Sequence, residues 1–300
     1  MRLACLLLLT ATASGCVWTS DGGFAPREES GFYPAVESAP GSFAGEPIVF
    51  HTHGRVTIVG VEGRDSISVR PRFYAGARDD ADARAAYDDA HRQLSITLVD
   101  GVWSIDCPGA EEDHGTAFAS GTGCTELQIE VPKGSVEQPL VITGSTFGGG
   151  MHVSNVVVEG LDLMASFGLV ADVVPVDGAS LELVGDPDLD AGMCSTWLRV
   201  PQDTAFDEVS LEVLTAKRRD PEDGPDNPKY WLEVDIRGFD DAPAIPRRTA
   251  EYAWTRDAAG PRVESARVVA DIGKAILTTG EVPPADASTL CEQWELGENL

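Results

Sequence analysis

The sequence predicts an all-β protein whose main domain is a single-layer β-solenoid, a stack of short strands with a short helical or loop insertion. Two observations support this fold class. Short segments with alternating apolar and polar residues recur from residue 47 almost to the end of the chain, as expected of strands with one buried face. Between residues 141 and 184, glycine-rich turns separate short apolar segments. This spacing fits a stack of short strands better than long hairpins. An antiparallel β-sandwich is the alternative fold.

Residues 1–15 have the features of an export signal. Arg2 supplies a positive charge, residues 3–9 form an apolar run, and small residues precede Cys16. The run is too short for a bilayer, which takes roughly 20 apolar residues. The segment resembles the lipobox of bacterial lipoproteins, which implies that Cys16 is acylated and becomes the mature N-terminus. Ala13 stands where the lipobox usually has leucine, and the alternative is an ordinary secretory signal that leaves Cys16 as a free thiol.

A lipid on Cys16 would attach the protein to a membrane of the bacterial cell envelope. Several acyl chains on one cysteine hold a protein stably, since each buried CH₂ contributes about 0.8 kcal/mol. Val17 after the cysteine favours the outer membrane. Residues 16–46 mix glycine, proline, serine and acidic residues without apolar periodicity, so we expect a flexible tether there.

The domain expected over residues 47–280 consists mainly of alternating segments. A period of two places the apolar side chains of each segment on one face of a strand. The apolar positions are Val56 and Ile58; Ile67 and Val69; Leu94, Ile96 and Leu98; Leu127, Ile129 and Val131; Leu181 and Leu183; Val209, Leu211 and Val213; and Leu232, Val234 and Ile236.

Two segments interrupt the strands. Residues 79–93 are rich in alanine, aspartate and arginine, and the apolar residues Ala83, Tyr87, Ala90 and Leu94 follow at helical spacing. This pattern predicts a short helix or an ordered loop. Residues 217–229 are polar and contain prolines, which indicates an exposed loop.

Three stretches carry a resemblance to a known family. They are residues 54–60 with 66–69, residues 127–132 leading into the glycine-rich segment, and residues 270–277. The resemblance extends over most of residues 47–280, which resemble the uncharacterised bacterial β-solenoid domains related to the "auto-transporter adhesin head" group. The resemblance implies a right-handed stack of short strands at the cell surface and no established enzymatic residues. The two insertions and four cysteines of the domain depart from the family pattern.

The cysteines are consistent with export to an oxidising compartment. One of the six leaves with the signal and Cys16 takes the lipid, so four remain for disulfides. Four cysteines allow three connectivities. We expect Cys107 to pair with Cys124 across a short polar loop, and Cys194 with Cys291 in the tail over residues 281–300. A metal site is the alternative, but the sequence has no CxxC pair and no Cys/His cluster at ligand spacing.

The formal net charge of −27 limits the partners. Such a field repels phosphate backbones and anionic headgroups, which argues against a nucleic-acid partner. Solubility at a crowded cell surface accounts for the charge without any cofactor. Weak binding of a divalent cation such as calcium is the alternative.

Two short motifs could hold a metal. His51 and His53 share one face of the expected strand, a spacing that metal sites use, but they are more simply polar residues at the start of a strand. Residues 186–192 resemble a calcium loop. They lack the glycine expected at the sixth position, and Trp197 stands where the twelfth-position glutamate belongs. We therefore predict no metal site.

No nucleophile motif is present. The glycine-rich residues 144–150 lack the following Lys-Ser/Thr of a phosphate loop, and no Gly-x-Ser-x-Gly elbow occurs. We expect a non-catalytic, structural or adhesive envelope protein whose partner is an envelope protein or a polysaccharide. The alternative, a polysaccharide-active enzyme on a similar scaffold, requires two close carboxylates and a groove of stacked aromatics. The aromatics to locate, each more simply explained by packing, are Trp103, Trp197, Trp231 and Trp254.

Overall fold

The computed structural model describes residues 16–18, 24–77, 79–108, 122–185, 193–214, 233–246, 249–271, 273–282 and 291–292. Within these residues the fold is all-β, and α-helix is confined to α1 (Asp80–Gln93). The strands are β1 (Cys16–Trp18), β2 (Phe24–Glu29), β3 (Val36–Glu37), β4 (Ile48–His53), β5 (Arg55–Val61), β6 (Ser68–Gly76), β7 (Ser95–Val99), β8 (Val102–Asp106), β9 (Thr122–Pro132), β10 (Leu140–Phe147), β11 (Met151–Ala165), β12 (Leu169–Gly185), β13 (Met193–Cys194), β14 (Thr196–Arg199), β15 (Ala205–Val213), β16 (Glu233–Arg237), β17 (Glu251–Arg256), β18 (Arg262–Ala270), β19 (Lys274–Thr278) and β20 (Cys291–Glu292).

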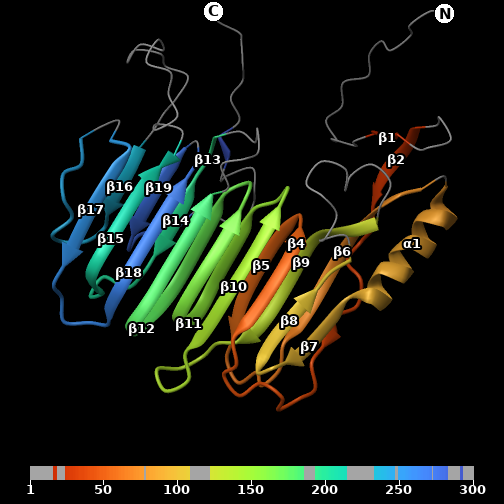
Figure 1. Ribbon diagram of the computed structural model, residues 1–300, viewed down its shortest axis with the longest axis horizontal. Helices are drawn as coiled ribbons and strands as arrows, with labels where there is room; N and C mark the ends of the chain where they lie inside the picture. The colour runs from red at the N-terminus through yellow and green to blue at the C-terminus, as the bar shows by residue number, and fades with distance from the viewer. Residues whose placement is uncertain are drawn as a thin grey trace, which may run out of the picture.

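Strand pairing forms two rows, which we call layer A and layer B. Layer A contains, side by side, β7, β8, β4, β10, the second halves of β11 and β12, β18, β15 and β17. Layer B contains β6, β9, β5, the first halves of β11 and β12, β14, β19 and β16. The pairs in the middle of both rows are parallel. Antiparallel pairs lie at both ends of layer A and at the β6 end of layer B, whereas the β19–β16 pair at the other end of layer B is parallel. Figure 1 shows this succession of strands, with α1 at one end and β17 at the other.

The core lies between the two layers. Apolar residues at every second position of both layers belong to one buried cluster, and the side chains in its middle are at most 1% exposed: Phe50, Ile142 and Leu163 from layer A, and Ile58, Val153 and Leu198 from layer B. Full burial of such a side chain contributes roughly 1.5–3 kcal/mol. The period of two in the sequence therefore determines which face of each strand joins the core.

The strands stack as rungs, each with one strand from layer A followed along the chain by one from layer B. In spatial order the rungs are β8–β9, β4–β5, β10–β11, β11–β12, β12–β14, β18–β19 and β15–β16. The three central rungs follow the chain. Towards the two ends, the spatial order of the rungs differs from their order along the chain. The β4–β5 rung lies between the β8–β9 and β10–β11 rungs, and the β18–β19 rung precedes the β15–β16 rung. The predicted class is thus confirmed as all-β, while the pairing departs from a regular coil in chain order.

Glycine permits the contact between β4 and β10. Gly144 lies opposite Phe50, and a Cβ at Gly144 would come within 2.0 Å of the Cζ atom of the phenyl ring. Nearby, the hydroxyl of Thr146 donates a hydrogen bond to the carbonyl of Gly54, and a Cβ at Gly149 would lie 2.0 Å from that same carbonyl. The glycine-rich segment therefore allows β10 to pack closely against a strand much earlier in the chain.

The helix predicted over residues 79–93 is confirmed. Asp79 caps its N-terminus, because its carboxylate accepts hydrogen bonds from the backbone N–H groups of residues 81 and 82, each at 2.9 Å. The helically spaced Ala83, Tyr87 and Ala90 are buried against the domain. The helical spacing of apolar residues in the sequence therefore identified the buried face of α1.

The alternating segments within the described residues form or border strands as predicted, and all of their apolar side chains except Leu98 are at least partly buried. Leu98 is 45% exposed, because β7 is the outermost strand of layer A and leaves this side chain at the margin of the core. Leu232 and residues 217–229 lie outside the described residues.

Part of the segment expected to be a flexible tether packs against the domain. β2 and β3 both pair with β6. The Tyr33 ring lies edge-on to Phe73, with 5.3 Å between centroids, and the Ser38 hydroxyl accepts a hydrogen bond from the N–H of Ile67 at 2.9 Å. Single side chains and backbone pairing make these contacts, which apolar periodicity could not reveal. Residues 24–46 therefore belong to the folded part of the chain.

Arg256, the last residue of β17, connects this end of the stack to neighbouring segments through hydrogen bonds. Its guanidinium donates hydrogen bonds to the backbone carbonyls of Gln202 and Thr204 at 2.8 and 2.6 Å and to the carboxylate of Asp241 at 2.7 Å. It also lies 4.9 Å from the ring centroid of Phe239. Because this side chain is only 8% exposed, it covers apolar surface as well as satisfying carbonyl groups.

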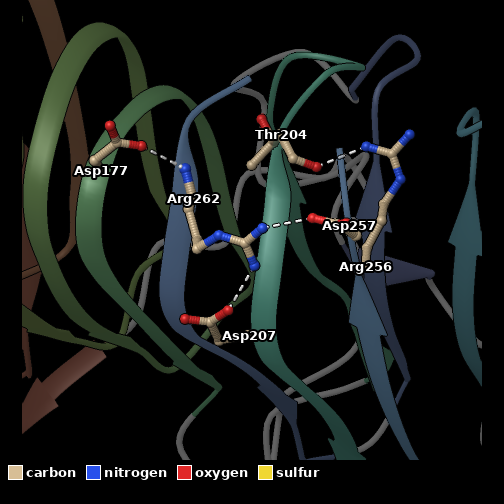
Figure 2. A network of polar contacts seen from close by, with 6 residues as sticks. All are labelled: Asp177, Thr204, Asp207, Arg256, Asp257 and Arg262. Atoms are coloured by element: carbon tan, nitrogen blue, oxygen red, sulfur yellow. Dashed lines mark hydrogen bonds and ion pairs between the residues drawn. The ribbon is translucent and has the colours of Figure 1, made fainter. Parts of the chain in front are cut away.

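Arg262, the first residue of β18, forms polar contacts with neighbouring strands at the same end of the stack. Its guanidinium pairs with Asp207 and Asp257, and its backbone N–H donates to the Asp177 carboxylate at 2.8 Å (Figure 2). The two ion pairs raise the pKa of the guanidinium. Polar contacts of this kind connect β12, β15 and β18 where the apolar core ends.

Candidate binding surfaces

The outer face of layer B carries one tryptophan among charged residues. Pairing aligns its outward-pointing side chains in rows across the strands. One row contains His152, Val170, Trp197, Ile276 and Asp235, and the next contains Ser154, Asp172, Arg199, Thr278 and Arg237. We call these ten residues the Trp197 surface.

Trp197 lies at the centre of this surface and is partly exposed. Its neighbours Val170 and Ile276 are 0% and 2% exposed although they point away from the core. The guanidinium of Arg237 lies 4.5 Å from the indole centroid, a distance at which cation–π attraction operates. Trp197 and Arg237 therefore belong to an apolar strip outside the core.

Ion pairs border the indole. Arg199 donates a hydrogen bond to Asp172 at 2.6 Å, and the Nε atom of Arg237 lies 3.8 Å from a carboxylate oxygen of Asp235. All four side chains are at least 30% exposed. Exposed pairs of this kind add little to stability, but they present donors and acceptors beside the ring.

His152 adds a polar atom whose hydrogen-bonding capacity is unmet. Its Nε2 atom is shielded from solvent and makes no hydrogen bond to the described part of the chain. Burial lowers the pKa of the imidazole, while the charge of Asp172 opposes this shift. The ring is therefore neutral at physiological pH.

The two layers differ in the charge of their outer faces. Outward strand positions of layer B carry Arg55, Arg70, Arg72, Arg199, Arg237 and Lys274 alongside Glu126, Glu130, Asp172, Glu233 and Asp235. Those of layer A carry Asp106, Asp162, Glu182, Glu212 and Glu251 alongside Arg267. Positive and negative charges therefore nearly balance on the outer face of layer B, although the chain as a whole has a net charge of −27.

Two carboxylates lie together on the outer face of layer A. Asp162 and Glu182 are directly opposite each other on β11 and β12. Loss of hydration and the charge of Glu182 raise the pKa of Asp162, whereas Arg267 forms an ion pair with Glu182.

His51 and His53 lie in different environments. His51 is exposed, and its Nδ1 atom shares a hydrogen bond with the hydroxyl of Ser145 on β10. His53 is 5% exposed, and its ring centroid lies 5.9 Å from that of Phe147. Within the described residues, no three side chains of His, Cys, Asp or Glu are grouped as a metal site requires.

Cys107 and Cys124 form a disulfide between the end of β8 and the start of β9. Cys194 is also disulfide-bonded and lies directly opposite Cys291 in the β13–β20 pair. This register is the one that the predicted Cys194–Cys291 bond requires. The side chain of Cys16, the predicted lipid-attachment site, lies outside the described part of the structure.

The tryptophans whose side chains the structure describes, Trp103, Trp197 and Trp254, do not form a row. Trp103 is buried, with its indole N–H donating to Glu46 at 3.2 Å. Trp254 packs against Phe206 and Phe239. Trp231 and the calcium-like residues 186–192 lie outside the described residues. Sequence reasoning thus named Trp197 but missed its partners His152, Arg199 and Arg237, which only the register between distant strands brings together.

Among the described residues, no helix combines the length and apolar character needed to cross a membrane. No protein-family model matches the chain, and no curated protein matches it. The chain is similar to a solved structure of a "putative cell adhesion protein" from Clostridium sporogenes, with 12% identity, 82% of this chain and 98% of that chain covered, and a TM-score of 0.48. It is also similar to a "putative lipid binding protein" from Parabacteroides distasonis, with 8% identity, coverages of 83% and 94%, and a TM-score of 0.23. Likeness at this level does not assign a function.

Proposed function

We propose that the chain is an exported lipoprotein, attached to the outer membrane through acyl chains on Cys16, whose β domain has a non-catalytic structural or adhesive role. The observation that carries this proposal is the export signal that ends in small residues and Cys16. The Cys107–Cys124 disulfide supports it, because such bonds persist in oxidising compartments outside the cytosol.

The domain is proposed to act as a solenoid-like stack that presents two broad faces. Parallel rungs with a shared core repeat the same outward positions from strand to strand, and surfaces of this kind suit extended partners. The partner is an envelope protein or a polysaccharide.

The anchor is tested by labelling cells with an alkyne analogue of palmitate and by partition of the extracted protein in Triton X-114. The native chain should be labelled and enter the detergent phase, whereas Cys16→Ala should be unlabelled and stay in the aqueous phase. Cys5→Ala, which changes a cysteine inside the signal, is the matched control and should behave like the native chain. Detergent partition of Cys16→Ala would remove this anchor from the proposal.

A polysaccharide-active enzyme is the second candidate, favoured by the opposed carboxylates Asp162 and Glu182. It predicts that the purified chain releases reducing ends from a polysaccharide and that Glu182→Gln abolishes the release. Binding without release of reducing ends supports the adhesive role instead.

A further inference from the structure

We infer that the Trp197 surface binds an extended, uncharged polysaccharide that lies across the strands of layer B. The inference rests on the proposed adhesive role and names both the face and the class of its partner. It depends on the aromatic ring, on the charge balance of the face and on the polar groups beside the ring.

The ring and its surroundings suit the apolar side of a sugar. A pyranose presents C–H groups on its faces and hydroxyls around its edge, so it packs on an exposed indole while its hydroxyls meet polar groups at the sides. Trp197 is partly exposed and is held by Arg237 at 4.5 Å. The ring is thus fixed before binding, which limits the conformational entropy lost in the complex.

The polar groups are placed for hydroxyls. The Asp172–Arg199 pair lies in the next row on the same face, two residues along β12 and β14 from Val170 and Trp197. Asp235 lies on the other side of the ring, in the same row. His152, also in that row, is partly exposed and adds an imidazole to the polar groups beside the ring.

The repeat of the face favours a polymer over a single sugar. Strands are about 4.8 Å apart, which is close to the length of one sugar residue in an extended glycan. A glycan lying perpendicular to the strands therefore passes in turn the partly or fully exposed side chains of β11, β12, β14 and β16, while Val170, Ile276 and Thr278 in the same rows are buried beneath it.

Charge selects an uncharged chain. The carboxylates and guanidinium groups of the surface are paired with each other, so they offer both donors and acceptors without a strong local field. The remainder of the chain, at a net charge of −27, repels polyanions at long range.

The test is binding of the purified full chain to soluble polysaccharides, measured by affinity electrophoresis and isothermal titration calorimetry in 0.15 M salt. The neutral probes are laminarin, mannan, dextran and xyloglucan, and the anionic probes are polygalacturonate and heparin. We expect a neutral polysaccharide to bind, Trp197→Ala to weaken binding at least tenfold, and Trp197→Phe to retain most of it. Asp106→Asn, which changes an exposed charged position on the outer face of layer A, is the control and should bind as the native chain does.

Equal binding by the native chain and Trp197→Ala would overturn the inference while leaving an adhesive protein with another site. Preference for the anionic probes, or no binding to any probe by the folded chain, would also overturn it. Thermal unfolding of each variant establishes that lost binding does not reflect lost folding. The anchor experiment with Cys16→Ala has an independent readout, so failure of one proposal is distinguishable from failure of the other.

Discussion

At the scale of single residues, two buried threonines on inner rows differ in a way that affects stability. The Oγ1 atom of Thr196 is shielded from water and makes no hydrogen bond to the described residues. Thr146 is equally buried, but its hydroxyl donates to the carbonyl of Gly54. An unmet buried hydroxyl costs free energy, whereas a satisfied one contributes to stability.

Thr196→Val should therefore raise the free energy of unfolding by about 1 kcal/mol. Thr146→Val, the matched control, should lower it by about 1–2 kcal/mol because the Gly54 carbonyl loses its donor. Urea unfolding followed by far-ultraviolet circular dichroism measures both. Destabilisation of similar size in the two variants would contradict the assignment of an unmet hydroxyl at Thr196.

His152 makes stability depend on pH. Its pKa is lowered in the folded chain, chiefly by burial, so the unfolded chain binds a proton more readily than the folded one does. The contribution of the neutral ring is fully present above the unfolded pKa of about 6.5 and is lost as the pH falls below it.

The native chain should accordingly lose stability relative to His152→Gln as the pH is lowered from 7.5 to 5. Groups that titrate in both proteins cancel in this difference. Urea midpoints collected across that range measure it, and a difference that stays constant with pH would show that the imidazole is not desolvated in the folded chain.

At the scale of elements, the Cys107–Cys124 disulfide connects the end of β8 in layer A to the start of β9 in layer B. A bond that closes a loop of this length, 17 residues apart in the chain, stabilises by about 3 kcal/mol in the chain-entropy model. Replacing both cysteines with serine should lower the unfolding free energy by that order, with the strands retained. Circular dichroism together with guanidinium unfolding tests this, and an unchanged midpoint would show that the loop is already constrained without the bond.

Elements with strong local signals were predictable from sequence. The helix at Asp80–Gln93 and strands such as Leu127–Val131 follow from spacing alone, because burial selects every second residue in a strand and a 3.6-residue stripe in a helix. The short strands β2 and β3 were missed, since their pairing with β6 involves backbone groups that leave no apolar pattern. The Trp197 surface was only partly predictable for a related reason. Its residues alternate with core residues on five different strands, and no local signal gives the register between them.

At the scale of the whole molecule, the chain order of the rungs is the feature that sequence could not supply. Alternation identifies strands and their buried faces, but it does not state which strands are neighbours. The contact of β4 with β10 is the clearest case, because more than ninety residues separate Ile48 from its partner Ile142 along the chain and a coil in strict chain order would place other strands between them.

A double-mutant cycle at this contact tests the arrangement. Gly144→Ala should cost about 1–3 kcal/mol, because the added Cβ would overlap the ring of Phe50. Phe50→Leu alone should cost about 1–2 kcal/mol through lost burial. In the double variant the smaller side chain makes room for the methyl group, so the two costs should fall short of additivity by at least about 0.5 kcal/mol.

Equilibrium urea unfolding of the four proteins gives the coupling energy. Gly144→Ala combined with Leu183→Val, a core change on β12 two strands away from β10, is the control pair and should be additive, because the two side chains share no contact of this kind. Additivity at Phe50 and Gly144 would mean that β4 and β10 are not neighbours, and with that the order of the first three rungs would fail.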